Sequence, residues 1–209
     1  MPVYGRIPPH TTMSLARTAQ ACGASGVPLE LCMEVRGIVH WARDTVFDSF
    51  LRSDKQKLFW IDSDLVWEPD SFLRMVALST KRDIICASYP AKTDQPTFQI
   101  SGTGKTETSD ELGLLPIGGA GLGFCIMDRS VCESIAATKD TSIDEVNGRE
   151  MKNVFRTDTV NGKRRGEDIA FFADLRALGH TIYLDPSITL GHAGEKTWTG
   201  RALDALSQL

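Results

Sequence analysis

Residues 58–64 read LFWIDSD, a short apolar run that leads directly into two carboxylates. The apolar run predicts a buried strand, and open α/β folds place their ligands where such strands end. Asp62 and Asp64 are two positions apart, so their side chains project to the same side while the chain stays extended. Two carboxylates on one side suit Mg²⁺ or Mn²⁺. The alternative is a polar turn before the next helix, since Asp and Ser are common turn residues.

The composition indicates one soluble domain. The chain has 209 residues, of which 42% are apolar and 24% charged, which is enough material for a sizeable core. Its net charge of −4 gives no general reason to expect a nucleic-acid or membrane surface. The five cysteines lack CxxC spacing, which predicts buried free thiols in a reducing compartment. Neither a signal peptide nor a membrane-length apolar run is apparent, so we expect a cytoplasmic protein without a membrane partner.

Strand and helix patterns alternate around the 58–61 strand. In the first half, apolar spacing predicts helices over 13–22, 39–50 and 69–76, with Thr12 as the first cap, and strands over 28–35 and 83–88. In the second half it predicts strands over 124–127 and 181–184, helices over 130–136 and 169–178, a loop over 138–166 and a tail helix from Thr199. This order predicts an α/β fold with a mostly parallel sheet.

Several motifs follow one another along the chain in a distinctive order. They are Ala42-Arg43-Asp44, Asp62-Ser63-Asp64, Tyr89-Pro90-Ala91-Lys92, the glycine run 118–123, Gly166-Glu167-Asp168, Leu184-Asp185-Pro186 and Leu190-Gly191-His192. In that order, over about residues 3 to 194, the chain resembles the GT-A glycosyltransferases, particularly small family-2-like members of the kind found in phage genomes. The resemblance implies one Rossmann-related domain over 1–209, with a mostly parallel mixed sheet flanked by helices. It would comprise a nucleotide-sugar-binding half (1–90), an acceptor and catalytic half (91–192) and a tail (193–209).

The resemblance also implies a metal site. The aspartate pair resembles the DxD motif, with Asp64 as first ligand of Mn²⁺ or Mg²⁺ and Asp62 on the ribose or on a metal-bound water. His192 resembles the late histidine ligand, although a solvated or capping histidine is the alternative for an isolated one. A divalent ion that bridges the donor phosphates would stabilise the charge of the leaving diphosphate.

Glu167 and Asp168 resemble the xED motif, which implies that Asp168 is the base of an inverting reaction and that Glu167 positions the acceptor. A carboxylate fixed at a helix start is well placed to take a proton from an acceptor hydroxyl. Both carboxylates also begin a predicted helix, where they would complement its dipole and cap its first amides. The second role does not exclude the first.

Candidate donor-binding residues surround these motifs. Glycines such as Gly119 and Gly121 let backbone approach a ligand closely, and no Gly-Lys-Ser/Thr follows them to suggest a P-loop. Arg43 and Lys92 could neutralise the diphosphate, or could be ordinary surface charges. The resemblance places Tyr4 at the end of the first strand, beside the nucleotide base. Trp198 could stack on a sugar, or could merely anchor the tail.

The segment 149–165 carries six basic and two acidic residues, a charge of +4 on an acidic chain. The family resemblance places this segment beside the acceptor. Its three consecutive cations, Lys163, Arg164 and Arg165, would suit a polyanionic acceptor, with a modified base in phage-type DNA the most specific candidate. The alternative is a solvated loop.

The function that we expect is transfer of a sugar from a nucleotide-sugar donor, UDP-linked by resemblance, to an acceptor hydroxyl, in the host cytoplasm if the protein is phage-encoded. Two alternatives stay open. A nucleotidyltransferase also combines an α/β sheet with acidic metal sites, but Tyr4-Gly5-Arg6-Ile7-Pro8 is a poor phosphate loop. A non-catalytic sugar-binding or assembly protein could use the same scaffold.

Overall fold

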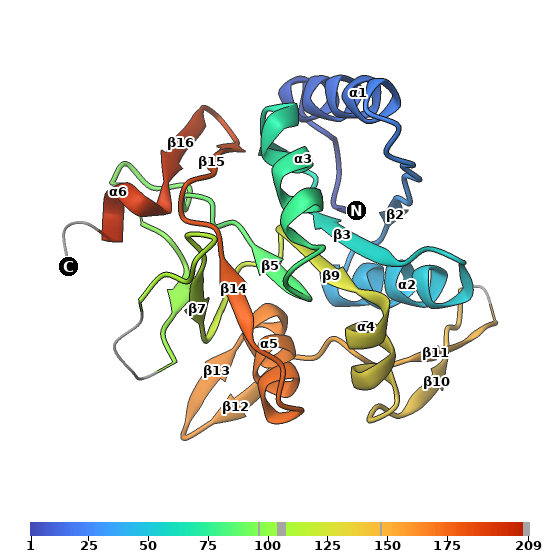
Figure 1. Ribbon diagram of the computed structural model, residues 1–209. Helices are drawn as coiled ribbons and strands as arrows, with labels where there is room; N and C mark the ends of the chain where they lie inside the picture. The colour runs from blue at the N-terminus through green and yellow to red at the C-terminus, as the bar shows by residue number, and fades with distance from the viewer. Residues whose placement is uncertain (96, 104–107, 147, 207–209) are drawn as a thin grey trace.

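The computed structural model describes residues 1–95, 97–103, 108–146 and 148–206, and Figure 1 shows a central sheet with helices on both sides. The sheet has five strands in the order β3-β9-β5-β14-β7. These strands are β3 (Lys57–Ile61), β9 (Phe124–Asp128), β5 (Ile84–Cys86), β14 (Ile182–Leu184) and β7 (Leu115–Ile117). The strands predicted over 58–61, 83–88, 124–127 and 181–184 are all present in this sheet.

The sheet is mixed, and most of its pairings are antiparallel. Only β5 and β14 pair in parallel, whereas β9 pairs antiparallel with both β3 and β5, and β7 with β14. Strands β3, β5 and β14 therefore run in one direction, but β9 returns between the first two of them. A mixed α/β sheet is confirmed, while the expected mostly parallel pairing is not found because β9 separates β3 from β5.

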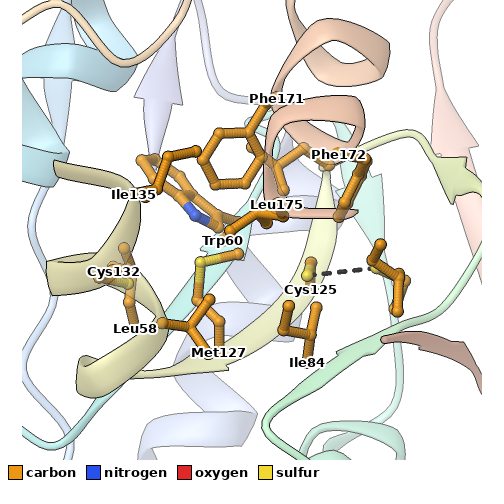
Figure 2. Close-up of a cluster of buried hydrophobic side chains, with 14 of the residues drawn as sticks. Leu58, Trp60, Ile84, Cys125, Met127, Cys132, Ile135, Phe171, Phe172 and Leu175 are labelled. Atoms are coloured by element: carbon orange, nitrogen blue, oxygen red, sulfur yellow. Dashed lines mark hydrogen bonds between the residues drawn. The ribbon is translucent and has the colours of Figure 1, made fainter. Parts of the chain in front are cut away.

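Two apolar clusters cover the two faces of the sheet, beneath the helices that lie on either side of it in Figure 1. Helices α1 (Pro9–Ala24) and α3 (Pro69–Leu78) contribute to one cluster, and α2 (Val39–Arg52), α4 (Arg129–Ala136) and α5 (Glu167–Ala177) to the other. Strand β3 alternates between them, with Leu58 and Trp60 in the α2/α4/α5 cluster and Ile61 in the α1/α3 cluster. Figure 2 shows Phe171 and Leu175 of α5 lying over Trp60. Burial on both faces explains the continuous apolar sequence of this strand.

A smaller sheet with the order β16-β15-β4 lies beside the main one. It contains β4 (Leu65–Val66), β15 (Thr189–Ala193) and β16 (Thr197–Arg201), and α6 (Ala202–Leu206) follows it. The tail thus begins as a strand, and its helix starts three residues later than the predicted Thr199. Residues 207–209 of the predicted tail lie outside the described residues.

The segment 138–166, which we expected to be a loop, contains two hairpins. Strands β10 (Thr141–Ile143) and β11 (Glu150–Lys152) form the first, and β12 (Asp158–Val160) and β13 (Lys163–Arg165) form the second. Most of their side chains are exposed, so no burial imposes an apolar alternation on the sequence. The sequence signals are two Asn-Gly pairs, at positions 147–148 and 161–162. At the second pair the φ values of 50° and 74° suit a tight hairpin turn.

The N-terminal region also differs from expectation. Of the strand predicted over 28–35 only β2 (Glu34–Val35) forms, because its parallel partner β1 (Pro2–Val3) offers just two residues. Helix α1 begins at Pro9 rather than after Thr12, whose hydroxyl donates to the Pro8 carbonyl from inside the first turn. A further pair, β6 (Ile100–Ser101) and β8 (Gly119–Ala120), leads into the glycine run.

The cysteines largely meet expectation, since all five are free thiols and only Cys32 is exposed. Within the part of the chain that the structure describes, none of the helices combines the length and the apolar character needed to cross a membrane.

Candidate functional site

Arg43 lies at the centre of a carboxylate cluster that joins three distant segments. Helix α2 carries its guanidinium into the interior, where the residue is only 2% exposed. Its Nη1 donates to Glu167 Oε1 at 3.1 Å and to Asp168 Oδ1, and its Nη2 donates to Asp62 Oδ1 at 3.1 Å. One guanidinium therefore faces three carboxylates, and the cluster as a whole stays acidic. The structure places Arg43 among protein carboxylates rather than at an open surface.

Asp62 is held at the end of β3 by contacts on both of its carboxylate oxygens. Besides Arg43 on Oδ1, the Tyr89 hydroxyl donates to Oδ2 at 3.1 Å. Burial raises the pKa of Tyr89 well above its ordinary value, so the phenol stays neutral and keeps its proton for this bond. Gly123 passes so close that a Cβ there would lie 2.4 Å from Asp62 Oδ2. Gly121 is equally confined, because its Cβ would lie 2.6 Å from the Tyr89 hydroxyl oxygen.

Asp168 is fixed from two sides at the start of α5. Its Oδ2 accepts the Leu122 backbone N–H at 3.0 Å, while its Oδ1 holds Arg43. The glycine run therefore serves the site by bringing a backbone donor to Asp168 and by making room for Asp62 and Tyr89. A carboxylate has about four lone-pair positions, so these two contacts leave Asp168 able to accept further hydrogen bonds.

A second centre forms around Asp64. The Lys92 Nζ donates to Asp64 Oδ2 at 2.6 Å, and His192 Nε2 lies 3.2 Å from the same oxygen. Burial alone would raise the pKa of Asp64, but the bonds with His192 and Lys92 outweigh it and lower the pKa to about 2. The carboxylate is therefore ionised at any physiological pH.

The hydrogen bond at the other ring nitrogen of His192 decides what its Nε2 can do. Nδ1 lies 2.9 Å from the Pro90 carbonyl oxygen, which can only accept, so Nδ1 carries the hydrogen. A neutral ring then turns the lone pair of Nε2 toward the Asp64 carboxylate. Nε2 and Asp64 Oδ2 then face each other as two acceptors, an arrangement that a neighbouring cation stabilises. A backbone carbonyl that orients a ligating histidine in this way is common at metal sites.

This donor set fits a divalent cation held by two protein ligands. Mg²⁺ and related hard cations are typically held by one or two carboxylates plus waters and substrate phosphates. Asp64 supplies one such carboxylate, and the His192 imidazole adds a nitrogen ligand that suits a transition metal such as Mn²⁺ better than Mg²⁺. Both oxygens of Asp62, by contrast, already have partners in Arg43 and Tyr89. Among the described residues, no group of three or more His, Cys, Asp or Glu side chains is arranged to hold a metal ion.

Trp198 belongs to the same side of the site as His192. The two residues are direct partners in the β15–β16 register, so their side chains project from the same face of the small sheet. Gly194 lies against the indole, because a Cβ on Gly194 would approach the Trp198 ring to 2.8 Å. The Tyr89 ring packs edge-on against His192 with centroids 5.1 Å apart. Aromatic rings thus flank the Asp64 centre.

The opposite face of the small sheet lines an open pocket of about 480 Å³. Val66, Gly191 and Thr199 share one row of the register and line this pocket, while His192 and Trp198 occupy the alternate row. Because successive strand residues point to opposite faces, the pocket and the Asp64 centre lie on the two sides of the same three strands.

Other predicted site residues lie elsewhere. Tyr4 follows β1 and is 77% exposed, and none of the hydrogen bonds or ring contacts among the described residues joins it to Arg43 or Asp64. Gly119 packs on α5, where its Cβ would lie 3.0 Å from Phe172 Cβ, so this face has no room for a ligand. Strand β13 carries Lys163, Arg164 and Arg165 on the second hairpin, and it ends two residues before Glu167 of the Arg43 cluster.

Three partners in the site were not expected from the sequence: the Tyr89 hydroxyl, the Leu122 amide and the Pro90 carbonyl. The two backbone groups carry no signal in a residue pattern. Tyr89 does carry one, since a tyrosine directly after a buried strand and before a proline is placed at the same sheet edge as Asp62.

Comparison with known proteins supports the fold alone. No family model and no curated protein matches the chain. A solved structure described as A197 from STIV matches with a TM-score of 0.61 and 19% sequence identity, over 96% of this chain and 87% of that one. At this identity the likeness indicates a shared α/β architecture.

Proposed function

We propose that this chain is a metal-dependent glycosyltransferase of the GT-A type, family-2-like, which moves a sugar from a nucleotide-sugar donor to an acceptor hydroxyl. One observation carries the proposal: Arg43 gathers Asp62, Glu167 and Asp168 into one cluster, although they come from segments as many as 125 positions away from it. The pairing of Asp64 with His192, 128 positions apart, adds the second half of the expected site. Residues chosen as separate motifs thus form two neighbouring centres, which Tyr89 connects by contacting both Asp62 and His192.

In the proposed reaction the acceptor oxygen forms a bond to the anomeric carbon of the donor. The bond from that carbon to the diphosphate oxygen breaks, and its electron pair leaves with the nucleoside diphosphate, UDP in the favoured case. Asp168 takes the proton of the acceptor hydroxyl, and Glu167 positions the acceptor beside it. Mn²⁺ or Mg²⁺, held by Asp64 and His192, would supply Lewis-acid stabilisation of the leaving group. A single displacement of this kind inverts the anomeric centre.

The acceptor that we propose is a polyanion, with a modified base in DNA as the most specific candidate. The support is the second hairpin, on which Lys163 and Arg164 are exposed. Its basic surface is smaller than the sequence indicates, because Arg165 pairs with Asp158 and Arg156 pairs with Asp174 of α5. If the protein is phage-encoded, this reaction would take place in the host cytoplasm.

The test is a panel of nucleotide sugars incubated with the protein and Mn²⁺, with products read by mass spectrometry. We expect slow, metal-dependent release of the nucleoside diphosphate from one donor, and loss of this release in Asp64→Asn. Release of pyrophosphate from a nucleoside triphosphate plus a sugar phosphate would instead identify a nucleotidyltransferase. Binding of a sugar nucleotide without turnover, under conditions that keep the protein folded, would identify a non-catalytic protein.

A further inference from the structure

Lys92 occupies the place at the Asp64 carboxylate where a metal ion would bind. Its ammonium and the His192 imidazole both approach one oxygen, Asp64 Oδ2, at 2.6 Å and 3.2 Å. A divalent ion bound by Asp64 and His192 would have to sit next to that same oxygen. The ammonium and the metal ion would therefore share one carboxylate oxygen, and their like charges would repel.

We propose that Lys92 is a resident cation that holds the Asp64–His192 pair until a divalent ion displaces it, and that the released ammonium then binds the donor diphosphate. This inference rests on the proposed function. It assigns Lys92 a positioning role before the metal arrives and a phosphate-binding role afterwards. Lys92 would thus contribute to the site in two successive states.

The surroundings of Lys92 allow it to leave. It lies in a turn whose ends are joined by the Ala91 N–H to the Thr97 carbonyl at 2.8 Å, so the side chain can move without disturbing a strand. The Lys92 side chain is 37% exposed and that of Asp64 33%, and ion pairs this exposed are weak.

The replacement also makes chemical sense. A divalent ion brings twice the charge of an ammonium to a carboxylate that stays ionised. It can also form a coordinate bond with the lone pair of His192 Nε2, which an ammonium cannot do. Once displaced, the lysine is a compact positive charge on a flexible stem beside the metal. Diphosphate is the natural partner for such a group, because lysine binds phosphate as a point charge.

The test uses Lys92→Met, which keeps the stem and removes the charge. Titration of Mn²⁺ alone, followed by calorimetry or electron paramagnetic resonance, should give about fivefold tighter binding than in the unmodified protein, as expected from removal of one exposed ion pair. Titration of UDP at saturating Mn²⁺ should give the opposite change, about fivefold weaker binding. Lys92→Arg keeps the charge and should restore most of the original metal affinity.

Lys196→Met is the matched control. Lys196 belongs to the turn between β15 and β16, pairs with Asp94 and lies 5.3 Å from the centroid of the Trp198 ring, so its loss removes a nearby charge without touching Asp64. Equal tightening in Lys196→Met and Lys92→Met would overturn the proposal in favour of a general electrostatic effect. Unchanged Mn²⁺ affinity in Lys92→Met, combined with loss of binding in Asp64→Asn, would overturn the role of Lys92 and leave the metal site intact. Absence of Mn²⁺ binding from every variant would instead overturn the proposed metal dependence.

Discussion

Arg43 and Asp168 lie 125 positions apart in the chain, yet the guanidinium of one hydrogen-bonds the carboxylate of the other inside the protein. This contact joins α2 to the start of α5. Because Arg43 also bonds Asp62, it connects the end of β3 to the segment that carries the candidate base. Buried arginine is costly unless its charge is compensated, and here three carboxylates provide the compensation. The candidate site is therefore also a structural joint of the fold.

Replacement of Arg43 should destabilise the protein strongly. Arg43→Leu leaves three carboxylates facing one another around a space that has lost its cation, and we expect a loss of about 3 kcal/mol in the free energy of unfolding. Urea denaturation measures this loss. Arg43→Lys should recover only part of it, because an ammonium cannot reach three carboxylates with the fork of a guanidinium.

Arg17→Leu serves as a control for this measurement, since the ion pair of Arg17 with Glu68 is long, at 4.0 Å, and exposed. It should change the unfolding midpoint little. Equal midpoints for Arg43→Leu and Arg17→Leu would show that the buried cluster contributes nothing to stability.

Asp44 should make stability depend on pH. Burial raises its pKa to about 7, even though its carboxylate accepts the backbone N–H groups of Val154 and Phe155. Between the ordinary pKa of 3.8 and about 7, the folded protein keeps a proton that the unfolded chain has lost, so the contribution of Asp44 to stability falls as the pH rises through this window. The slope should reach at most about 1.4 kcal/mol per pH unit.

Asp44→Asn should remove this slope while its side-chain oxygen still accepts both backbone bonds. Asp44→Ala should also remove the slope but lose both bonds, at a cost of about 1–3 kcal/mol for the unpaired donors. Urea midpoints recorded from pH 4 to pH 7 compare the three proteins. An identical pH slope in Asp44→Asn and the unmodified protein would rule out Asp44 as its source.

Asp64→Asn and His192→Ala should weaken Mn²⁺-dependent binding of UDP by at least about tenfold, because each removes one of the two proposed metal ligands. Both residues lie outside the main sheet, so melting temperatures should change little. Calorimetry with and without Mn²⁺ measures the effect. Asp62→Asn should change the affinity for Mn²⁺ alone by less than about threefold, since Asp62 bonds Arg43 and Tyr89 and is not one of the two proposed metal ligands. A larger loss in Asp62→Asn than in Asp64→Asn would reverse the two roles.

Asp168→Asn should reduce sugar transfer by at least about 100-fold and leave UDP affinity within a few-fold of the original, as expected for a base that acts only in the transition state. The asparagine oxygen can still accept the Leu122 N–H, and Arg43 loses one acceptor but keeps Glu167 of the same helix and Asp62, so the start of α5 should keep its position. Single-turnover kinetics with the donor identified from the panel separate the two quantities. Glu167→Gln, the neighbouring control, should lose less turnover, and comparable losses in binding and turnover for Asp168→Asn would make Asp168 a structural residue.

DNA binding, if it occurs, should depend on the exposed cations of the second hairpin. Each lost phosphate contact should flatten the plot of log affinity against log salt concentration by about 1, so Lys163→Gln combined with Arg164→Gln should reduce the slope by about 2. Lys55→Gln, which removes a cation paired with Asp54 elsewhere, should leave the slope unchanged. Fluorescence anisotropy at several salt concentrations provides the measurement. If the protein does not bind DNA even at low salt concentration, nucleic acid is excluded as a partner.

Burial explains which parts of the fold the sequence predicts. Strand β3 and helix α2 have dense apolar contacts, and their patterns identify them within one or two residues. The two hairpins of the segment 138–166 depend on backbone pairing at the surface, which leaves no apolar period to detect. The strand expected over 28–35 shows the reverse case, since its alternation is real but Leu29 and Leu31 are exposed and only the last two residues find a partner strand.

The same distinction applies to the site. Carboxylates at strand and helix ends could be chosen from the sequence, because their positions follow from element boundaries. The partners of each carboxylate could not be predicted. The sequence left Arg43 as a diphosphate ligand or a surface charge, and the structure places it against three carboxylates. Hydrogen bonds from backbone groups, such as the Leu122 amide, depend on the path of a glycine-rich segment that no residue pattern specifies.

The position of β9 between β3 and β5 has a consequence for synthesis of the protein on the ribosome. Strands β3 and β5 are complete once residue 86 has been made, but neither can gain its main-sheet partner until residues 124–128 have left the exit tunnel. During that interval the nascent chain exposes two apolar strands with unpaired edges, which are prone to aggregate. The first 90 residues should therefore fail to fold when released alone and should depend on continued translation, or on a chaperone, for their solubility.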